Sequence, residues 1–206
     1  YSVPFSEPFI PTIGKYGKNW ITLISASKAF SFPGPRCAIA IISPHINEKK
    51  YTNLKKFCDR EQFGHAFSLG GLYVTTSGTS HTAQYGLAKM LEAATSGEFN
   101  FIEITSEYGR RAEKVKEIFL KYGFEQVYKK DMDETVGNGF YLTMSYPGYG
   151  GNDLMLELLR YGISTITLKS TGSVRHEGLR VCISFIGLEE MPTLENKLQK
   201  FMEDHK

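Results

Sequence analysis

The sequence contains little cysteine, little net charge and no long apolar run. Its three cysteines, Cys37, Cys58 and Cys182, are far apart in a chain of 206 residues. This spacing indicates reduced thiols, not a disulfide framework or a cysteine zinc site. The formal net charge is only +2, so bulk charge predicts no nucleic-acid or membrane-surface partner. No apolar run approaches the ~20 residues of a membrane helix, and no signal-peptide pattern is present. We therefore expect a globular, cytoplasmic protein.

Two short apolar runs joined by a polar turn are the most informative stretch of the chain. Residues 20–24 (WITLI) and 37–42 (CAIAII) have the length and composition of buried strands. The connection between them is short and contains Pro33 and Pro35, which disfavour the helix that a parallel crossover usually carries. We therefore expect the two strands to run antiparallel, with both ends of the connection at one sheet edge.

This topology predicts that Ser25, Lys28 and Arg36 converge at that edge. A desolvated lysine near another cation has a lowered pKa, which makes it a nucleophile towards carbonyl groups. Arginine binds phosphate through two parallel N–H donors, and a serine hydroxyl can add a hydrogen bond to the same phosphate. The three residues together suit a phosphorylated aldehyde. On spacing alone, a surface hairpin with a solvated lysine and arginine remains the alternative.

Residues 25–36 (SASKAFSFPGPR) resemble the cofactor-lysine signature of pyridoxal-phosphate enzymes of the aspartate aminotransferase superfamily, class I/II and fold type I. The resemblance implies that Lys28 binds pyridoxal 5'-phosphate covalently. It also implies that Ser25, three positions earlier, and Arg36, eight positions later, bind the phosphate. Cys37 stands where the family often has a small apolar residue, which is a mild departure.

The first residue of the chain fits the same resemblance. The family has a tyrosine about this far ahead of the lysine, bound to the phenolic oxygen of the cofactor, so Tyr1 is the candidate for that role. A frayed chain end is the alternative. The chain does not begin with Met, and enzymes of the family are much longer. We therefore expect the C-terminal half of such an enzyme, without the aspartate that pairs with the pyridine nitrogen and inactive alone.

Hydrophobic periodicity predicts the rest of the architecture. For the class, the resemblance implies α/β, with the C-terminal part of a cofactor-binding large domain joined by a long helix to a small α+β domain. The helix at about residues 99–122 suits such a connector, so we divide the chain into domains 1–105 and 106–206. Residues 63–78 give no clear prediction. The other expected helices cover about residues 47–60, 83–96, 153–161 and 192–203, and further strands cover residues 124–128, 140–146, 163–168 and 179–185.

Arg180 lies in an otherwise apolar predicted strand, residues 179–185. Burial of an arginine costs free energy unless the guanidinium meets an anion. An edge strand with Arg180 in solvent and an internal ion pair are the alternatives to a ligand anion. In the resembling family, an arginine at this place in the small domain binds the α-carboxylate of the substrate, and this is the role we expect for Arg180.

The resemblance implies an aminotransferase that uses pyridoxal 5'-phosphate to move an amino group between an amino acid and a 2-oxo acid. It also implies a homodimer with active sites between the subunits, with Lys28 as the catalytic residue. The sequence predicts no metal site. Two alternatives share the motif: a lyase or decarboxylating synthase on the same cofactor, and a non-enzymatic aminotransferase-like sensor domain of a transcription regulator.

Overall fold

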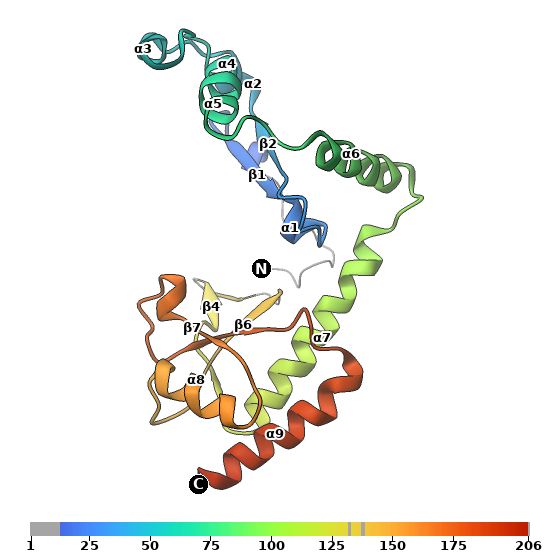
Figure 1. Cartoon of the computed structure of the whole chain (residues 1–206), viewed down its shortest axis with the longest axis vertical. Coiled ribbons are helices and arrows are strands. Elements are labelled where there is room, and N and C mark those ends of the chain that lie inside the picture. The colour runs from blue at the N-terminus through green and yellow to red at the C-terminus, as the bar shows by residue number, and fades with distance from the viewer. Residues whose placement is uncertain (1–12, 132, 137–138, 206) are drawn as a thin grey trace. The chain divides into compact units, whose positions relative to one another are not determined.

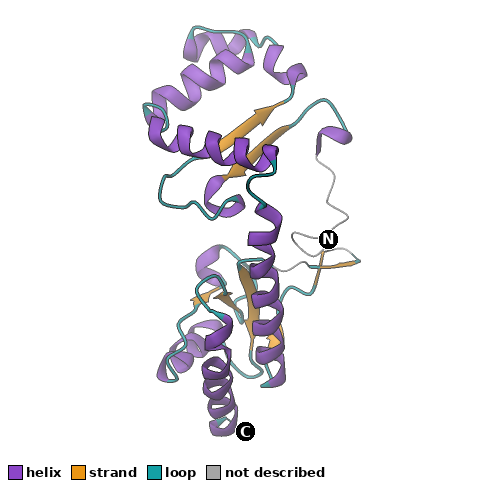
Figure 2. Ribbon diagram, turned by 90° about the vertical axis from the view of Figure 1, so that its right-hand side faces the viewer, coloured by secondary structure: helices purple, strands orange, loops and turns teal. Residues whose placement is uncertain are grey.

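The computed structural model describes residues 13–131, 133–136 and 139–205 (Figure 1). They form two compact units, residues 13–101 and residues 102–205. Each unit has its own sheet, as the ribbon coloured by secondary structure shows (Figure 2). The boundary expected between residues 105 and 106 falls inside helix α7 (Phe101–Lys121).

The first unit is organised around an antiparallel hairpin. Strand β1 (Ile21–Ser25) pairs with β2 (Ala38–Ile42) in a register that runs from Ile21 opposite Ile42 to Ser25 opposite Ala38. The predicted antiparallel pairing is confirmed. The one-turn helix α1 (Ala26–Ala29) follows β1. The amphipathic helix α6 (His81–Ser96) confirms the helix predicted at residues 83–96. A small core joins these elements; its buried members are Ala26, Cys37, Ala83 and Leu87.

The single helix expected at residues 47–60 is wrong. Lys49 has an extended backbone with ψ 136°, which ends the first short helix, and Lys50 instead pairs with Gln62 in an antiparallel bridge. Phe57, an apolar residue inside this range, is 85% exposed. A contact across the chain therefore overrides the local helical period. The observed elements around it are η1 (Ile13–Lys15), α2 (Pro44–Glu48), η2 (Thr52–Leu54) and α3 (Lys55–Cys58).

Residues 63–76, where periodicity supports no clear prediction, are helical throughout. Gly64 and Gly70 allow close packing here, because a Cβ on Gly70 would lie 2.4 Å from Cβ of Cys58. The wide turns of a π-helix occupy the middle of this segment. Its parts are α4 (Phe63–His65), the π-helix η3 (Ala66–Tyr73) and α5 (Val74–Thr76).

The second unit contains a four-stranded antiparallel sheet in the order β3-β6-β8-β7. The strands are β3 (Glu125–Gln126), β6 (Tyr141–Ser145), β7 (Ile166–Thr167) and β8 (Leu179–Cys182), with a separate pair β4 (Lys130–Asp131) and β5 (Glu134–Thr135). The remaining elements are α7, α8 (Gly151–Arg160), η4 (Lys169–Thr171), η5 (Leu188–Glu190) and α9 (Met191–Asp204). The predicted helices at residues 99–122, 153–161 and 192–203 are confirmed.

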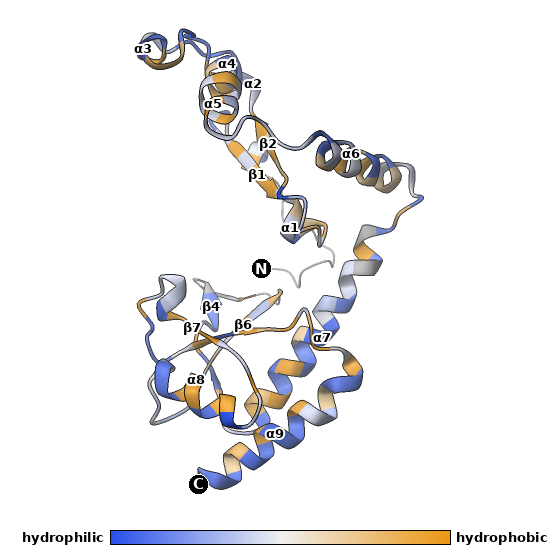
Figure 3. Cartoon of the chain, in the orientation of Figure 1, coloured by the Kyte–Doolittle hydropathy of each residue, from blue (hydrophilic) through white to orange (hydrophobic). Residues whose placement is uncertain are grey.

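Alternation along the strands gives this sheet two different faces. The residues of β6 and β8 that point to one face are buried in a core with α7, α8 and α9, and these are Leu142, Met144, Leu179 and Val181. Along α8 and α9, apolar residues alternate with hydrophilic ones, as expected for helices with one buried face (Figure 3). The intervening strand residues, Tyr141, Thr143 and Arg180, belong to the other face of the sheet.

None of the described helices is both long and apolar enough to cross a membrane. The three cysteines are free thiols: Cys37 is buried, Cys58 is half-buried and Cys182 is exposed.

Two glycines of the second unit give a matched test of this packing. A Cβ on Gly151 would lie 2.6 Å from the carbonyl oxygen of His176 and 2.8 Å from that of Gly178, whereas a Cβ on Gly109 meets nothing within 4 Å. We expect Gly151→Ala to lower the free energy of unfolding by about 1–3 kcal/mol through overpacking. Gly109→Ala should raise it by about 0.5–1 kcal/mol through helix propensity. Urea denaturation followed by circular dichroism checks both; equal effects would contradict the described packing.

Candidate active site

The end of the β1–β2 hairpin carries the predicted cofactor residues. Ser25 ends β1, Lys28 lies in α1, and Arg36 comes two residues before β2. The backbone N–H of Ala26 donates to the carbonyl oxygen of Cys37 at 3.1 Å, so the hairpin continues beyond its last strand pair. The chain that follows β1 therefore stays next to the chain that precedes β2.

The guanidinium of Arg36 reaches back to α1. Its Nη1 donates to the carbonyl oxygen of Pro33 at 3.0 Å and to the hydroxyl of Ser27 at 3.5 Å, and Ser27 is the residue just before Lys28. Arg36 also has a positive φ of 55°. A non-glycine residue pays roughly 1–2 kcal/mol for this conformation. Such strain is concentrated at functional sites, where the surrounding structure holds it.

Ser25 and Lys28 are both exposed at this end of the hairpin. Ser25 occupies the N-cap position of α1, yet its hydroxyl forms no capping hydrogen bond, so the helix does not use this oxygen. The proposed chemistry needs a lysine that is shielded from water. This chain alone does not shield Lys28, which is exposed. The physical reason is local: α1 is a single turn at the end of a two-stranded sheet.

A cavity of about 670 Å³ opens beside Arg36. The start of β2, the π-helix η3, α5 and the first turn of α6 form its walls. Arg36 is the cation among the described lining residues, and the hydroxyl groups of the lining belong to Ser68, Tyr73, Thr76, Thr79 and Ser80. A cation surrounded by hydroxyl donors suits a small anion. Sequence reasoning missed this cavity because its walls come from the segment without a clear periodicity.

Arg180 lies on β8, a central strand between β6 and β7. The edge-strand alternative is therefore wrong. The guanidinium carbon stands 4.3 Å from the ring centroid of Tyr141, a cation–π contact within the same face of the sheet. Tyr141 was not singled out from the sequence, because its position opposite β8 depends on a strand pairing and not on a motif.

The Nε atom of Arg180 is buried and meets no hydrogen-bond acceptor among the described residues. Within the same residues, Arg180 also has no carboxylate within ion-pair distance, so the internal ion pair is not formed there. An unsatisfied buried donor costs about 1–3 kcal/mol, and more for a charged group. Arg180 is thus suited to an anion that arrives as a ligand.

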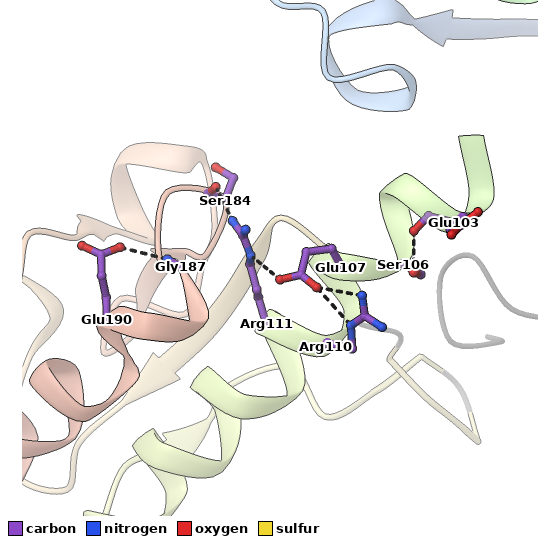
Figure 4. A network of polar contacts seen from close by, with 8 residues as sticks. All are labelled: Glu103, Ser106, Glu107, Arg110, Arg111, Ser184, Gly187 and Glu190. Carbon is purple, nitrogen blue, oxygen red and sulfur yellow. Dashed lines mark hydrogen bonds and ion pairs between the residues drawn. The ribbon is translucent and has the colours of Figure 1, made fainter. Parts of the chain in front are cut away.

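A polar network fixes the loop that follows β8 (Figure 4). Nε of Arg111 on α7 donates to Glu107 at 3.1 Å, and Nη1 of Arg111 donates to the carbonyl oxygen of Ser184 at 3.4 Å. The hydrogen bond from Arg111, followed by that from Arg110, lowers the pKa of Glu107. These contacts tie the end of the strand that carries Arg180 to the long helix.

The remaining predicted residue, Tyr1, lies outside the described residues. Lys28 belongs to the unit of residues 13–101, and Arg180 belongs to the unit of residues 102–205. The roles of Ser25, Lys28, Arg36, Tyr1 and Arg180 stay predictions.

Solved aminotransferases have the same fold as this chain. Aspartate aminotransferase from Thermotoga maritima matches with a TM-score of 0.66 and 15% identity over 97% of this chain and 44% of its own. The α-aminoadipate aminotransferase from Thermus thermophilus gives 0.66 and 15% over 97% and 46%. The aromatic aminotransferase from Pyrococcus horikoshii OT3 gives 0.66 and 16% over 90% and 43%. No family model matches the sequence, and no curated protein matches it.

The fold is therefore that of the C-terminal portion of fold-type-I pyridoxal-phosphate aminotransferases, as the resemblance implied. The chain spans less than half the length of the solved chains that it matches.

The unpaired Nε of Arg180 generates a stability prediction. Arg180→Met removes a half-buried charge whose Nε atom has no hydrogen-bond acceptor among the described residues, and the methionine can keep the packing against Tyr141. We therefore expect the free energy of unfolding to be unchanged or to rise by up to about 1 kcal/mol. The matched variant Arg111→Met breaks the contacts to Glu107 and Ser184 and should lower it by about 1 kcal/mol. Chemical denaturation of both variants checks this; a loss larger for Arg180 than for Arg111 would mark Arg180 as structural.

Proposed function

We propose that this chain provides the cofactor lysine and the substrate-carboxylate arginine of a pyridoxal-phosphate-dependent aminotransferase. The carrying observation is the buried, unsatisfied Nε atom of Arg180 in a chain with the aminotransferase fold. In the proposed protein, an amino acid and a 2-oxo acid are the substrates and the active form is a homodimer. The polypeptide beyond this chain completes the site.

The residues of the hairpin end fit the cofactor. Pyridoxal phosphate presents a phosphate and an aldehyde. Arg36 supplies a guanidinium at the mouth of a cavity, and Ser25 supplies a hydroxyl that its own helix does not use. Lys28, in the same one-turn helix, supplies the amine for the aldehyde. One of the structural neighbours, the Thermus thermophilus α-aminoadipate aminotransferase, was solved as a complex with N-(5'-phosphopyridoxyl)-L-leucine. We assign Tyr1 to the phenolic oxygen.

The proposed chemistry gives each residue a distinct task. When bound, the cofactor acts as an electron sink that stabilises negative charge at the substrate α-carbon. Arg36 and Ser25 hold the phosphate and so fix the position of the ring. Arg180 binds the substrate carboxylate in bidentate fashion and orients the α-carbon. The free amine of Lys28 would act as the base that takes the proton from the substrate α-carbon, and its ammonium form would later act as the acid that returns this proton.

Borohydride trapping tests the cofactor half on the chain itself. We incubate the chain with pyridoxal 5'-phosphate, reduce it and map the modified lysines by mass spectrometry. Lys28 should be labelled in preference to the other lysines, because the phosphate is held beside it. Arg36→Met should reduce labelling of Lys28 about tenfold, as expected for loss of a charge-assisted phosphate contact.

Two controls make the trapping result decisive. Arg60→Met removes an exposed arginine that pairs only weakly with Asp59, at 3.9 Å, and should leave the labelling unchanged. Pyridoxal without phosphate should lose the preference for Lys28. Uniform labelling of all lysines, or labelling that is insensitive to Arg36→Met, would refute the cofactor assignment.

Amino-group transfer tests the reaction class. The full-length protein should convert 2-oxoglutarate to glutamate with a panel of amino acids, and Lys28→Ala should abolish turnover. Arg180→Lys should raise KM for the carboxylate substrate by at least about tenfold, because a lysine cannot replace bidentate binding. Cofactor binding without any transfer would favour a lyase, a synthase or a sensor domain. We expect the chain alone to show no turnover.

A further inference from the structure

A second cavity lies within the unit of residues 102–205 and has a volume of about 360 Å³. One wall is the first half of α9, and the others are residues 162–164 and the chain from Cys182 to Ile186. Arg180 is not among its lining residues. The volume falls in the range of small-ligand sites in proteins. The functions proposed above make no use of this cavity.

The loop after β8 presents an apolar rim to this cavity. Phe185 lines the cavity and is 92% exposed. The backbone on both sides of it is held: the carbonyl oxygen of Ser184 accepts from Arg111 at 3.4 Å, and the N–H of Gly187 donates to Glu190 at 2.8 Å (Figure 4). A fixed backbone that leaves a phenylalanine in water at the mouth of a cavity favours an apolar ligand.

Lys197 supplies a cation at the other part of the cavity wall. Its Nζ donates to the carbonyl oxygen of Gly162 at 2.9 Å. An ammonium has three donors, so this bond leaves capacity for a ligand. Among the described residues, no carboxylate lies within ion-pair distance of Lys197. The contact to Gly162 is a neutral one, and it leaves the charge of the ammonium without a counter-ion in that part of the chain.

The acid that lines the cavity is separated from this cation. Glu190 precedes Lys197 by seven residues, or two helical turns, which is roughly 10 Å along the axis. Its carboxylate already accepts the N–H of Gly187. Leu194 lies between them on the same helix face, and Ile163 and Ile186 add to the apolar wall. The cavity thus combines an anion-binding end with an apolar stretch of about 10 Å.

We propose that this cavity binds a monocarboxylic acid with a short unbranched apolar tail. The carboxylate pairs with the ammonium of Lys197, and the tail lies against Leu194 and Ile186 towards Phe185. An unbranched tail of about seven carbons is close in length to the roughly 10 Å that separates Glu190 from Lys197 along this wall. The proposal is independent of the aminotransferase assignment.

Titration with octanoate tests the proposal, with binding followed by calorimetry and by amide chemical shifts. Saturable binding is expected, with shifts at residues 162–164 and 182–197. Lys197→Met should raise the dissociation constant at least about tenfold, whereas Lys200→Met, an exposed lysine of α9 outside the cavity lining, should not. Phe185→Ser, which alters an exposed side chain and spares the fold, should also weaken binding.

Two further experiments distinguish binding in this cavity from binding of the fatty acid elsewhere on the protein. Octan-1-ol should bind at least about tenfold more weakly than octanoate, since it lacks the charge that pairs with Lys197. Arg180→Met should leave octanoate binding unchanged. Equal binding of the alcohol, loss of binding in Arg180→Met, or the absence of saturable binding would each overturn the proposal.

Discussion

One backbone hydrogen bond holds the cofactor half of the candidate site together. The bond from the N–H of Ala26 to the carbonyl oxygen of Cys37 extends the hairpin by one pair beyond its strands. It places the one-turn helix of Lys28 next to the strained backbone of Arg36. Ala26 at this junction is fully buried and shares a small core with Cys37. The backbone pairing therefore keeps the chain segments of Lys28 and Arg36 adjacent, whatever their side chains do.

The surroundings of Arg180, the candidate carboxylate-binding residue, depend on the difference between the two faces of one sheet. Helices α7, α8 and α9 bury the apolar residues of β6 and β8, and this large core supplies the stability of the unit. The opposite face is then free to carry a costly residue. The cation–π contact with Tyr141 offsets part of the free-energy cost of desolvating Arg180. The Nε atom of Arg180 nevertheless has no hydrogen-bond acceptor among the described residues. A well-packed unit can tolerate such a donor, and a ligand anion is the natural partner for it.

Local patterns predicted some of this architecture well and some of it poorly. The hydrophobic periodicity of α7 and the short apolar runs of β1 and β2 are local signals, and each indicated the right element. The helix expected at residues 47–60 failed, because the bridge between Lys50 and Gln62 is a long-range contact that periodicity does not contain. For the same reason, the sequence did not predict the contact of Tyr141 with Arg180 or the cavity beside Arg36. The predicted hairpin and a family resemblance singled out the motif residues, whereas the residues around them could come only from the fold.

The central position of β8 has a consequence for how this unit can vary. Strand side chains alternate between faces, so a slip of one residue against β6 would exchange every inward and outward position. The guanidinium would then enter the helix-covered core, and Leu179 and Val181 would meet water. An insertion or deletion inside β8 would therefore disrupt both the packing of the core and the position of Arg180. Residues 169–175 of the connection before β8 are mostly exposed and carry no such alternation, so length changes among natural variants should accumulate there and not in the strand.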